Sequence, residues 1–405
     1  MLRTMLRFGN HLTLPTLTFL VTVIATGLVS CATTTKLDQI VLDYDGTVAE
    51  SVSKLLLLNI ARARQNKPMH FTAVSSIVAT YKFTVGGGFL PAGTGNFGWL
   101  PVPHVGGAVE ENPTVSIAPM QGDEFTQRVL TPFQEEKLTL LLRQGYDVDA
   151  LLRMLGGEVR LDGESAGTDA TSRNRPGDKL GYETYRHVMA HLSAIQDQHS
   201  LFVEPLYFDH NWSISADAVT PETFESTYKG FSTIYDAEKR SWRITKRIIG
   251  RVMISNYDPA ELSNEERFAL HAQAEEAPFN DVLLDIRAGH VGGEYPLHGR
   301  FRLRSFHEVL MFIGRGIGEE PESDVAPDAR TPAISENPRS ALEIIESRIP
   351  PNGEAMMVRL NGAYYAVRPQ ANYQWNEKAF ALLNQLFQMS VSNIPYSGPA
   401  ITIAK

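Results

Sequence analysis

Apolar and polar positions recur with two different periods along this chain, and the two periods predict both helices and strands. Apolar residues spaced three and four apart are typical of helices that bury one face. Several of these segments begin at a possible capping residue, such as Thr131 or Asp147, and end at glycine. The predicted helices are Val48–Gln65, Leu130–Gly145, Asp147–Gly156, Tyr182–Gln198 and Trp375–Met389.

Runs of β-branched and aromatic residues between glycines and prolines predict strands. Near the carboxyl end, Asn361-Gly362 supplies the two positive-φ residues of a tight hairpin turn, and helix and strand patterns follow that hairpin. Helices and strands therefore mix without the regular alternation of a parallel sheet, which predicts an α+β fold with a C-terminal hairpin–helix–strand unit. The strand segments are Met69–Val85, Thr114–Met120, Ser200–Phe208, Arg240–Ile248, Asp281–Arg287, the start of Gly299–Gly318, Ala355–Pro369 and Ala400–Ala404.

Two segments rich in glycine or polar residues are predicted to be loops. Gly86–Gly107 contains GTGNFG, which matches a dinucleotide-binding pattern, but Trp99 and two prolines follow where that pattern requires a helix. We expect a flexible or membrane-proximal loop there, and a surface loop or boundary at 163–181. The predicted layout is a signal peptide at 1–30, a lipidated tether at 31–37, α+β regions at 38–162 and 182–405, and the polar loop between them.

The first thirty residues have the features of a secretory signal. Arg3 and Arg7 precede an acid-free apolar run that ends at Leu28–Cys31, with the sequence LVSC. This stretch resembles the lipobox of bacterial lipoproteins, which implies acylation of Cys31. Cys31 is the one cysteine of the chain, so an internal disulfide and a multi-cysteine metal site are excluded. By the same resemblance, Ala32 implies an outer-membrane anchor with the body in the periplasm; a stray cysteine in an ordinary signal is the alternative.

The charge of the chain argues against a nucleic-acid partner. The formal net charge is −9, and removal of the signal would take away two arginines and no acids. Nucleic-acid binding depends on clustered lysine and arginine. The most basic stretch, Lys239–Arg251, interleaves its bases with apolar residues, which predicts one solvated and one buried face; contact with anionic lipid or glycan is the alternative.

The stretch LDYDGTV resembles the first motif of haloacid-dehalogenase-type phosphatases. The resemblance would make Asp43 the nucleophile and Asp45 the acid/base, beside Mg²⁺. The later strand-end residues of that family, including its lysine and second acidic pair, are not found in order. Our preferred interpretation is therefore that both carboxylates stabilise the start of a helix, with a Mg²⁺-dependent phosphatase as the alternative.

A metal site is a weaker alternative at Glu183, His187 and His191. These residues are four apart on one predicted helix, so they could share a face. The spacing lacks the HExxH pattern of zinc enzymes, and a solvated helical stripe explains it as well. No serine-hydrolase elbow or phosphate-binding loop is present in the sequence, and we predict no cofactor.

Several longer segments, among them Leu55–Phe83, Glu111–Leu155, Phe301–Gly314 and Ala363–Met389, resemble a group of uncharacterised Gram-negative lipoproteins. That resemblance implies no reaction. We therefore expect a membrane-anchored, non-enzymatic binding or scaffold protein of the envelope. Its acyl chains would contact the membrane, and its partner would be an envelope protein or a glycan.

Overall fold

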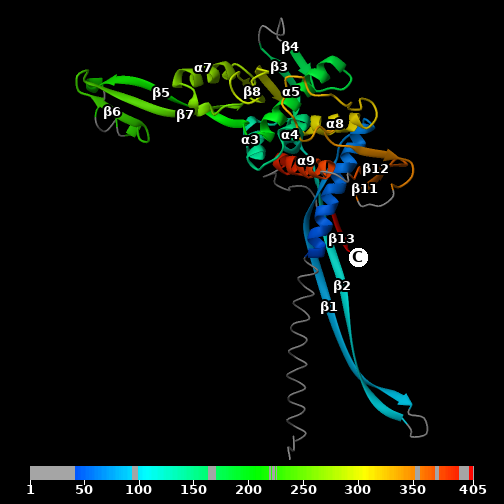
Figure 1. Cartoon of the computed structure of the whole chain (residues 1–405). Helices are drawn as coiled ribbons and strands as arrows, with labels where there is room; N and C mark the ends of the chain where they lie inside the picture. The colour runs from blue at the N-terminus through cyan, green and yellow to red at the C-terminus, as the bar shows by residue number, and fades with distance from the viewer. Residues whose placement is uncertain are drawn as a thin grey trace, which may run out of the picture. The chain divides into compact units, whose positions relative to one another are not determined.

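The computed structural model describes residues 42–93, 99–162, 170–218, 220, 224, 226–351, 356–369, 374–391 and 401–404. The predicted signal, tether and Cys31 lie outside these residues. The chain divides into two units, Met1–Lys54 and Leu55–Lys405. The described part combines helices with mostly antiparallel sheets, so the predicted α+β class is confirmed (Figure 1).

The largest sheet has seven strands and one parallel pair, β7 with β8. Its order is β4-β3-β9-β8-β7-β5, with β6 paired to β7 beside this path. The strands are β3 (Gly156–Leu161), β4 (Ala170–Arg173), β5 (Phe202–Ser215), β6 (Ser232–Asp236), β7 (Ser241–Ser255), β8 (Asp281–Ile286) and β9 (Leu297–Leu303). Because β3 pairs with β9, the segments on either side of 163–181 contribute strands to one sheet.

Buried and more exposed side chains alternate along β9, which shows how the sheet separates its core face from its polar face. Leu297, Phe301 and Leu303 are buried, whereas His298 is exposed and Arg302 is half-buried. Side chains on a strand point to opposite faces in turn, so one face of β9 packs in the core and the other carries charge. Burying each large apolar side chain on such a face stabilises the fold by about 1.5–3 kcal/mol.

Helices pack beside this sheet and against one another. Contacts join α4 to α5, α4 to α8, and both α2 and α8 to α9. The helical residues 55–64 of the second unit bury Leu56, Leu57 and Ile60 completely. The helices are α2 (Asp123–Leu130), α3 (Glu135–Arg143), α4 (Val148–Leu155), α5 (Lys179–Asp197), α7 (Asn264–Glu275), α8 (Phe306–Gly316) and α9 (Trp375–Val391).

The prediction of a glycine-rich loop at 86–107 is wrong, because the described residues of this stretch belong to two paired strands. Strand β1 (Phe71–Gly93) pairs in antiparallel register with β2 (Trp99–Met120), from Phe71↔Met120 to Gly93↔Trp99. Figure 1 shows them as one long two-stranded ribbon. Glycine is unfavourable in isolated strands, but backbone pairing satisfies its N–H and C=O groups without a side chain.

The C-terminal elements occur in the predicted order but not in one sheet. β10 (Ile344–Ser347), β12 (Ala363–Val367) and β11 (Met357–Leu360) form a three-stranded sheet, whereas β13 (Ile401–Ala404) pairs with β2. The predicted turn between β11 and β12 is confirmed, since Asn361 and Gly362 have φ of 50° and 87°. Pattern alone therefore located these strands without identifying their partners.

Helix boundaries were predicted unevenly. α4 begins and ends as expected, with Asp147 and Gly156 at its caps. α3, in contrast, begins at Glu135 rather than at Leu130, because the chain at Pro132 is extended and bridges to Ser305. The predicted cap Thr131 lies before α3, and its hydroxyl donates to the Gln127 carbonyl at 2.7 Å instead.

Candidate functional site

Asp43 and Asp45 lie within the helix at residues 42–64, and both are exposed. The phosphatase motif that they resemble ends a strand, so its local backbone differs from the one found here. The Thr47 hydroxyl donates to the Asp43 carbonyl at 2.7 Å, as in a regular helix turn. The carboxylates therefore project from a helix, and their predicted role at the start of that helix stays a prediction.

The three candidate metal ligands on α5 differ in environment. Glu183 is exposed, His187 is half-buried, and His191 is fully buried with Nε2 at 2.9 Å from the carbonyl oxygen of Gly292. Burial lowers the pKa of His191, which keeps the ring neutral. Among the described residues, no group of three or more His, Cys, Asp or Glu side chains is arranged to hold a metal ion.

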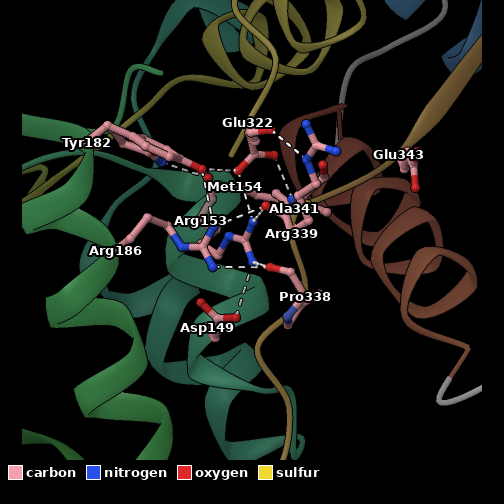
Figure 2. Close-up of polar contacts among 12 residues, drawn as sticks. Asp149, Arg153, Met154, Tyr182, Arg186, Glu322, Pro338, Arg339, Ala341 and Glu343 are labelled. Atoms are coloured by element: carbon pink, nitrogen blue, oxygen red, sulfur yellow. Dashed lines mark hydrogen bonds and ion pairs between the residues drawn. The ribbon is translucent and has the colours of Figure 1, made fainter. Parts of the chain in front are cut away.

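A buried ion-pair network joins α4 and α5 to the strap, which we define as the irregular segment at residues 319–343. Figure 2 shows Arg153 of α4 at its centre. The Arg153 guanidinium is fully buried and donates to Glu322 at 2.9 Å and to the carbonyl oxygens of Pro338 and Arg339 at 2.7 and 2.8 Å. Arg186 of α5 donates to the same two carbonyls, both at 3.1 Å. The strap is therefore attached to both helices by guanidinium groups.

Arg153 and Glu322, at the centre of this network, each stabilise the charged form of the other. Burial opposes the charge on Arg153, but the carboxylates of Glu322 and Asp149 outweigh it and raise the Arg153 pKa. Burial alone would raise the pKa of Glu322, whereas Arg153 and the hydrogen bonds from the Ala341 N–H and the Tyr182 hydroxyl lower it. Both groups are thus ionised at neutral pH, and loss of either one would leave an unpaired buried charge.

The carbonyl end of α4 connects this network to a pocket. The last carbonyls of a helix lack partners inside the helix. Here Tyr185 donates to the Leu152 carbonyl at 2.7 Å, Asn174 to that of Arg153 at 2.9 Å, and Arg304 to those of Arg153 and Met154 at 3.3 and 3.2 Å. A cation at a helix C-terminus is also favoured by the helix dipole. Arg304 is therefore held in place by the protein itself.

Arg304 lies in the wall of a pocket of about 560 Å³, the arginine pocket. Charged residues dominate its lining, with five arginines and three glutamates. They come from β3, β4, β9, α8 and the beginning of the strap. The charged residues are Glu158, Arg173, Arg175, Arg302, Arg304, Glu308, Arg315 and Glu320.

The three glutamates of the arginine pocket are already bonded. Glu158 pairs with Arg160 and Arg302, and Glu320 pairs with Arg175. Glu308 accepts a hydrogen bond from the Ser305 N–H at 2.8 Å in the capping box of α8. None of them is bonded to the remaining arginines of the lining.

Three arginines of the pocket form no hydrogen bond or ion pair with a carboxylate among the described residues, although Glu308 and Glu320 act on Arg304 and Arg315 at longer range. Within the described chain, the guanidinium groups of Arg173 and Arg315 have no hydrogen bond or ion pair. Arg304 donates three hydrogen bonds, all to carbonyl oxygens, and stacks on the Phe312 ring at 4.1 Å. Burial lowers the pKa of Arg304 to about 10, so it is still cationic at neutral pH. The arginine pocket thus holds positive charge that the described residues do not neutralise.

A second polar cluster surrounds Asp285 at the end of β8. Its buried carboxylate accepts hydrogen bonds from the Tyr257 hydroxyl, from Arg287 Nε at 2.9 Å and from His298 Nδ1 at 2.6 Å. Burial raises the pKa of Tyr257, so the phenol is a neutral donor. Three donors from the protein occupy this carboxylate, and we assign the cluster a structural role.

Sequence reasoning missed the arginine pocket, although part of the signal was visible. Arg300, Arg302 and Arg304 alternate along one strand and its exit, which predicts one basic face. Arg315 follows on the next helix, α8, whereas Arg173 lies far away in sequence on β4, and the pairing of β3 with both β4 and β9 brings that segment to the pocket.

No family model, curated protein or solved structure matches this chain. The resemblance to uncharacterised lipoproteins therefore stays a prediction from sequence. Within the described residues, no helix is long and apolar enough to cross a membrane.

Proposed function

We propose that this chain is a lipid-anchored binding protein of the cell envelope that holds an anionic ligand in the arginine pocket without catalysing a reaction. The observation that carries the ligand class is the set of three guanidinium groups, on Arg173, Arg304 and Arg315, that share one pocket and form no ion pair with a carboxylate among the described residues. The anchor at Cys31 rests on the sequence alone.

Charge and chemistry both favour binding of an anion. The chain as a whole is acidic, with a net charge of −9. A cluster of arginines in a concave site of such a chain creates a local positive potential that attracts anions. Guanidinium groups bind carboxylates and phosphates through paired N–H donors. The lining holds His307 and three glutamates but no serine, threonine, cysteine or lysine, and the glutamates are bonded to arginines or to the Ser305 N–H, which favours binding over covalent catalysis.

The test measures binding of inorganic phosphate to the full chain, purified from membranes in neutral detergent, by isothermal titration calorimetry. We expect Arg173→Gln and Arg315→Gln each to weaken binding about tenfold, because each removes a charge-assisted hydrogen bond worth about 1.5–3 kcal/mol. Arg304 is not used for this test, since it also caps α4.

Arg240→Gln is the matched control. Arg240 is an exposed arginine outside the arginine pocket, paired with Asp217 at 3.2 Å, and its loss should leave phosphate affinity unchanged. Equal affinity in the wild type and in the Arg173→Gln/Arg315→Gln double variant would refute the proposed site.

A further inference from the structure

The lining of the arginine pocket is partly charged and partly apolar, and this combination indicates one class of anion. Beside the arginines lie Met311 and Phe312 of α8, both half-buried, together with Leu303 and Pro176. The pocket volume of about 560 Å³ is within the range of pockets that enclose whole organic ligands, and a bare inorganic anion would fill only a small part of it. A ligand that matched the lining would therefore carry an apolar body as well as a charged head.

The number of free cations sets the charge of that head. Five arginines and three glutamates leave two positive charges unneutralised in the described lining, because the Glu308 carboxylate, bonded to the neutral Ser305 N–H, offsets part of the charge of Arg304. A single carboxylate would neutralise one of them. A phosphate monoester carries about −1.5 to −2 at neutral pH and has three strong acceptor oxygens.

Arg304 has N–H donors left over, so it can bind a head group that accepts several hydrogen bonds. A guanidinium has five N–H donors. Three hydrogen bonds to the carbonyls of Arg153, Met154 and Asn174 account for part of this capacity, so two N–H groups are left for a ligand. Because the three bonds and the stacking on Phe312 fix the plane of the group, little rotamer entropy is lost when a ligand binds.

We propose that the ligand of the arginine pocket is a phosphate monoester with an apolar body, its phosphate on Arg173, Arg304 and Arg315 and its apolar part on Met311 and Phe312. This rests on the proposed anion-binding function and narrows it to a ligand class. The ligand can come from the membrane, as a phosphomonoester lipid headgroup, or from solution, as a free organic phosphate.

The test compares three small probes on the full chain in vesicles of phosphatidylcholine: inorganic phosphate, hexyl phosphate and hexanoate. We expect hexyl phosphate to bind at least about tenfold more tightly than inorganic phosphate, the factor that corresponds to burial of roughly two methylene groups. Hexanoate, with a single charge, should bind more weakly than hexyl phosphate. Met311→Gln should reduce the gain from the hexyl chain, measured as the ratio of the affinities for hexyl phosphate and inorganic phosphate.

Leu130→Gln is the matched control for that variant, because Leu130 is an exposed leucine outside the pocket lining. Addition of phosphatidic acid to the vesicles distinguishes the two sources. If the lipid headgroup is the ligand, phosphatidic acid will compete with hexyl phosphate; if the ligand is a free organic phosphate, the affinity will be unchanged.

Failure of this inference is separable from failure of the proposed function. Equal affinity for hexyl phosphate and inorganic phosphate, with both still lost in the arginine variants, would overturn the apolar body and leave anion binding intact. Hexanoate binding as tight as hexyl phosphate would overturn the choice of phosphate. Absence of binding by all three probes would overturn both proposals.

Discussion

Arg153 illustrates how one buried charge can determine the position of a whole segment. Its guanidinium is fully buried, yet it donates hydrogen bonds to a carboxylate and to two strap carbonyls. Isolated burial of such a charge would cost several kcal/mol. The network is therefore a strong constraint on the strap, although an apolar replacement of the whole pair could be equally stable.

We expect Arg153→Met to destabilise the fold by about 3–5 kcal/mol, because Glu322 would become a buried, unpaired carboxylate. Urea unfolding followed by tryptophan fluorescence measures the change. The double variant Arg153→Met/Glu322→Leu should recover much of the loss. Arg240→Met, which breaks an ion pair with both side chains 71% exposed, should cost less than about 1 kcal/mol. A loss as small in Arg153→Met as in this control would contradict the account.

Because His191 is buried, we expect the stability of the protein to depend on pH. Burial lowers its folded-state pKa below the ordinary value of 6.5, so the unfolded chain binds a proton more readily than the folded one. Stability should therefore fall as the pH drops below about 6.5, by at most about 1.4 kcal/mol per pH unit for this one proton. The groups that face the ring are the Gly292 carbonyl, the Tyr295 ring, Asp328 and Arg330.

The measurement is the urea midpoint between pH 7.5 and 5.5 for the wild type and for His191→Gln, in which an amide N–H replaces the ring donor. We expect a shallower slope in the variant. His210→Gln, an exposed histidine on β5, should keep the wild-type slope. Identical slopes for the wild type and His191→Gln would show that another group is responsible.

At the scale of elements, close packing of α8 on the helical residues 55–64 depends on one small residue. A Cβ at Gly314 would lie 2.8 Å from Ala63 Cβ and from the Arg64 backbone nitrogen, whereas a Cβ at Gly316 would meet nothing within 4 Å. Both glycines belong to the same helix. The two positions therefore separate steric crowding from helix propensity.

We expect Gly314→Ala to destabilise the protein by about 1–3 kcal/mol through overpacking. Gly316→Ala should be neutral or stabilise it by up to about 1 kcal/mol, since alanine favours helix. The denaturant midpoints of the two variants, compared with that of the wild type, measure these changes in stability. Equal shifts in both would show that the two helices are not packed as described.

Elements were easier to predict from sequence than their partners. Periodicity located α4, α5, α9 and the Asn361-Gly362 turn, because each depends on residues that are neighbours in the chain. It misassigned the glycine-rich stretch at 86–107 and grouped β13 with β12, since strand pairing is a long-range choice. The arginine pocket was missed for the same reason, because the pairing of β3 with β4 and β9 brings Arg173 to Arg304 and Arg315.

At the scale of the whole molecule, the predicted anchor has a direct test. Cys31 lies outside the described residues, so the prediction rests on the sequence LVSC at Leu28–Cys31. Labelled palmitate should enter the wild-type chain in cells and should be absent from Cys31→Ser, which should also leave the membrane fraction, because acyl chains supply about 0.8 kcal/mol of membrane affinity per methylene. Unlabelled wild type, or identical fractionation of both proteins, would remove the anchor from the proposed function.

The pairing of β13 with β2 has a consequence for biogenesis. Residues 114–117 of β2 obtain their outer hydrogen-bonding partners from residues 401–404, more than half the length of the chain away. A chain synthesised amino end first would thus have an unpaired edge on β2 until residues 401–404 are made, and unpaired edges can pair with other chains. A copy clipped before residue 401 would keep that edge unpaired, which makes proteolytic removal of the last residues a route to aggregation.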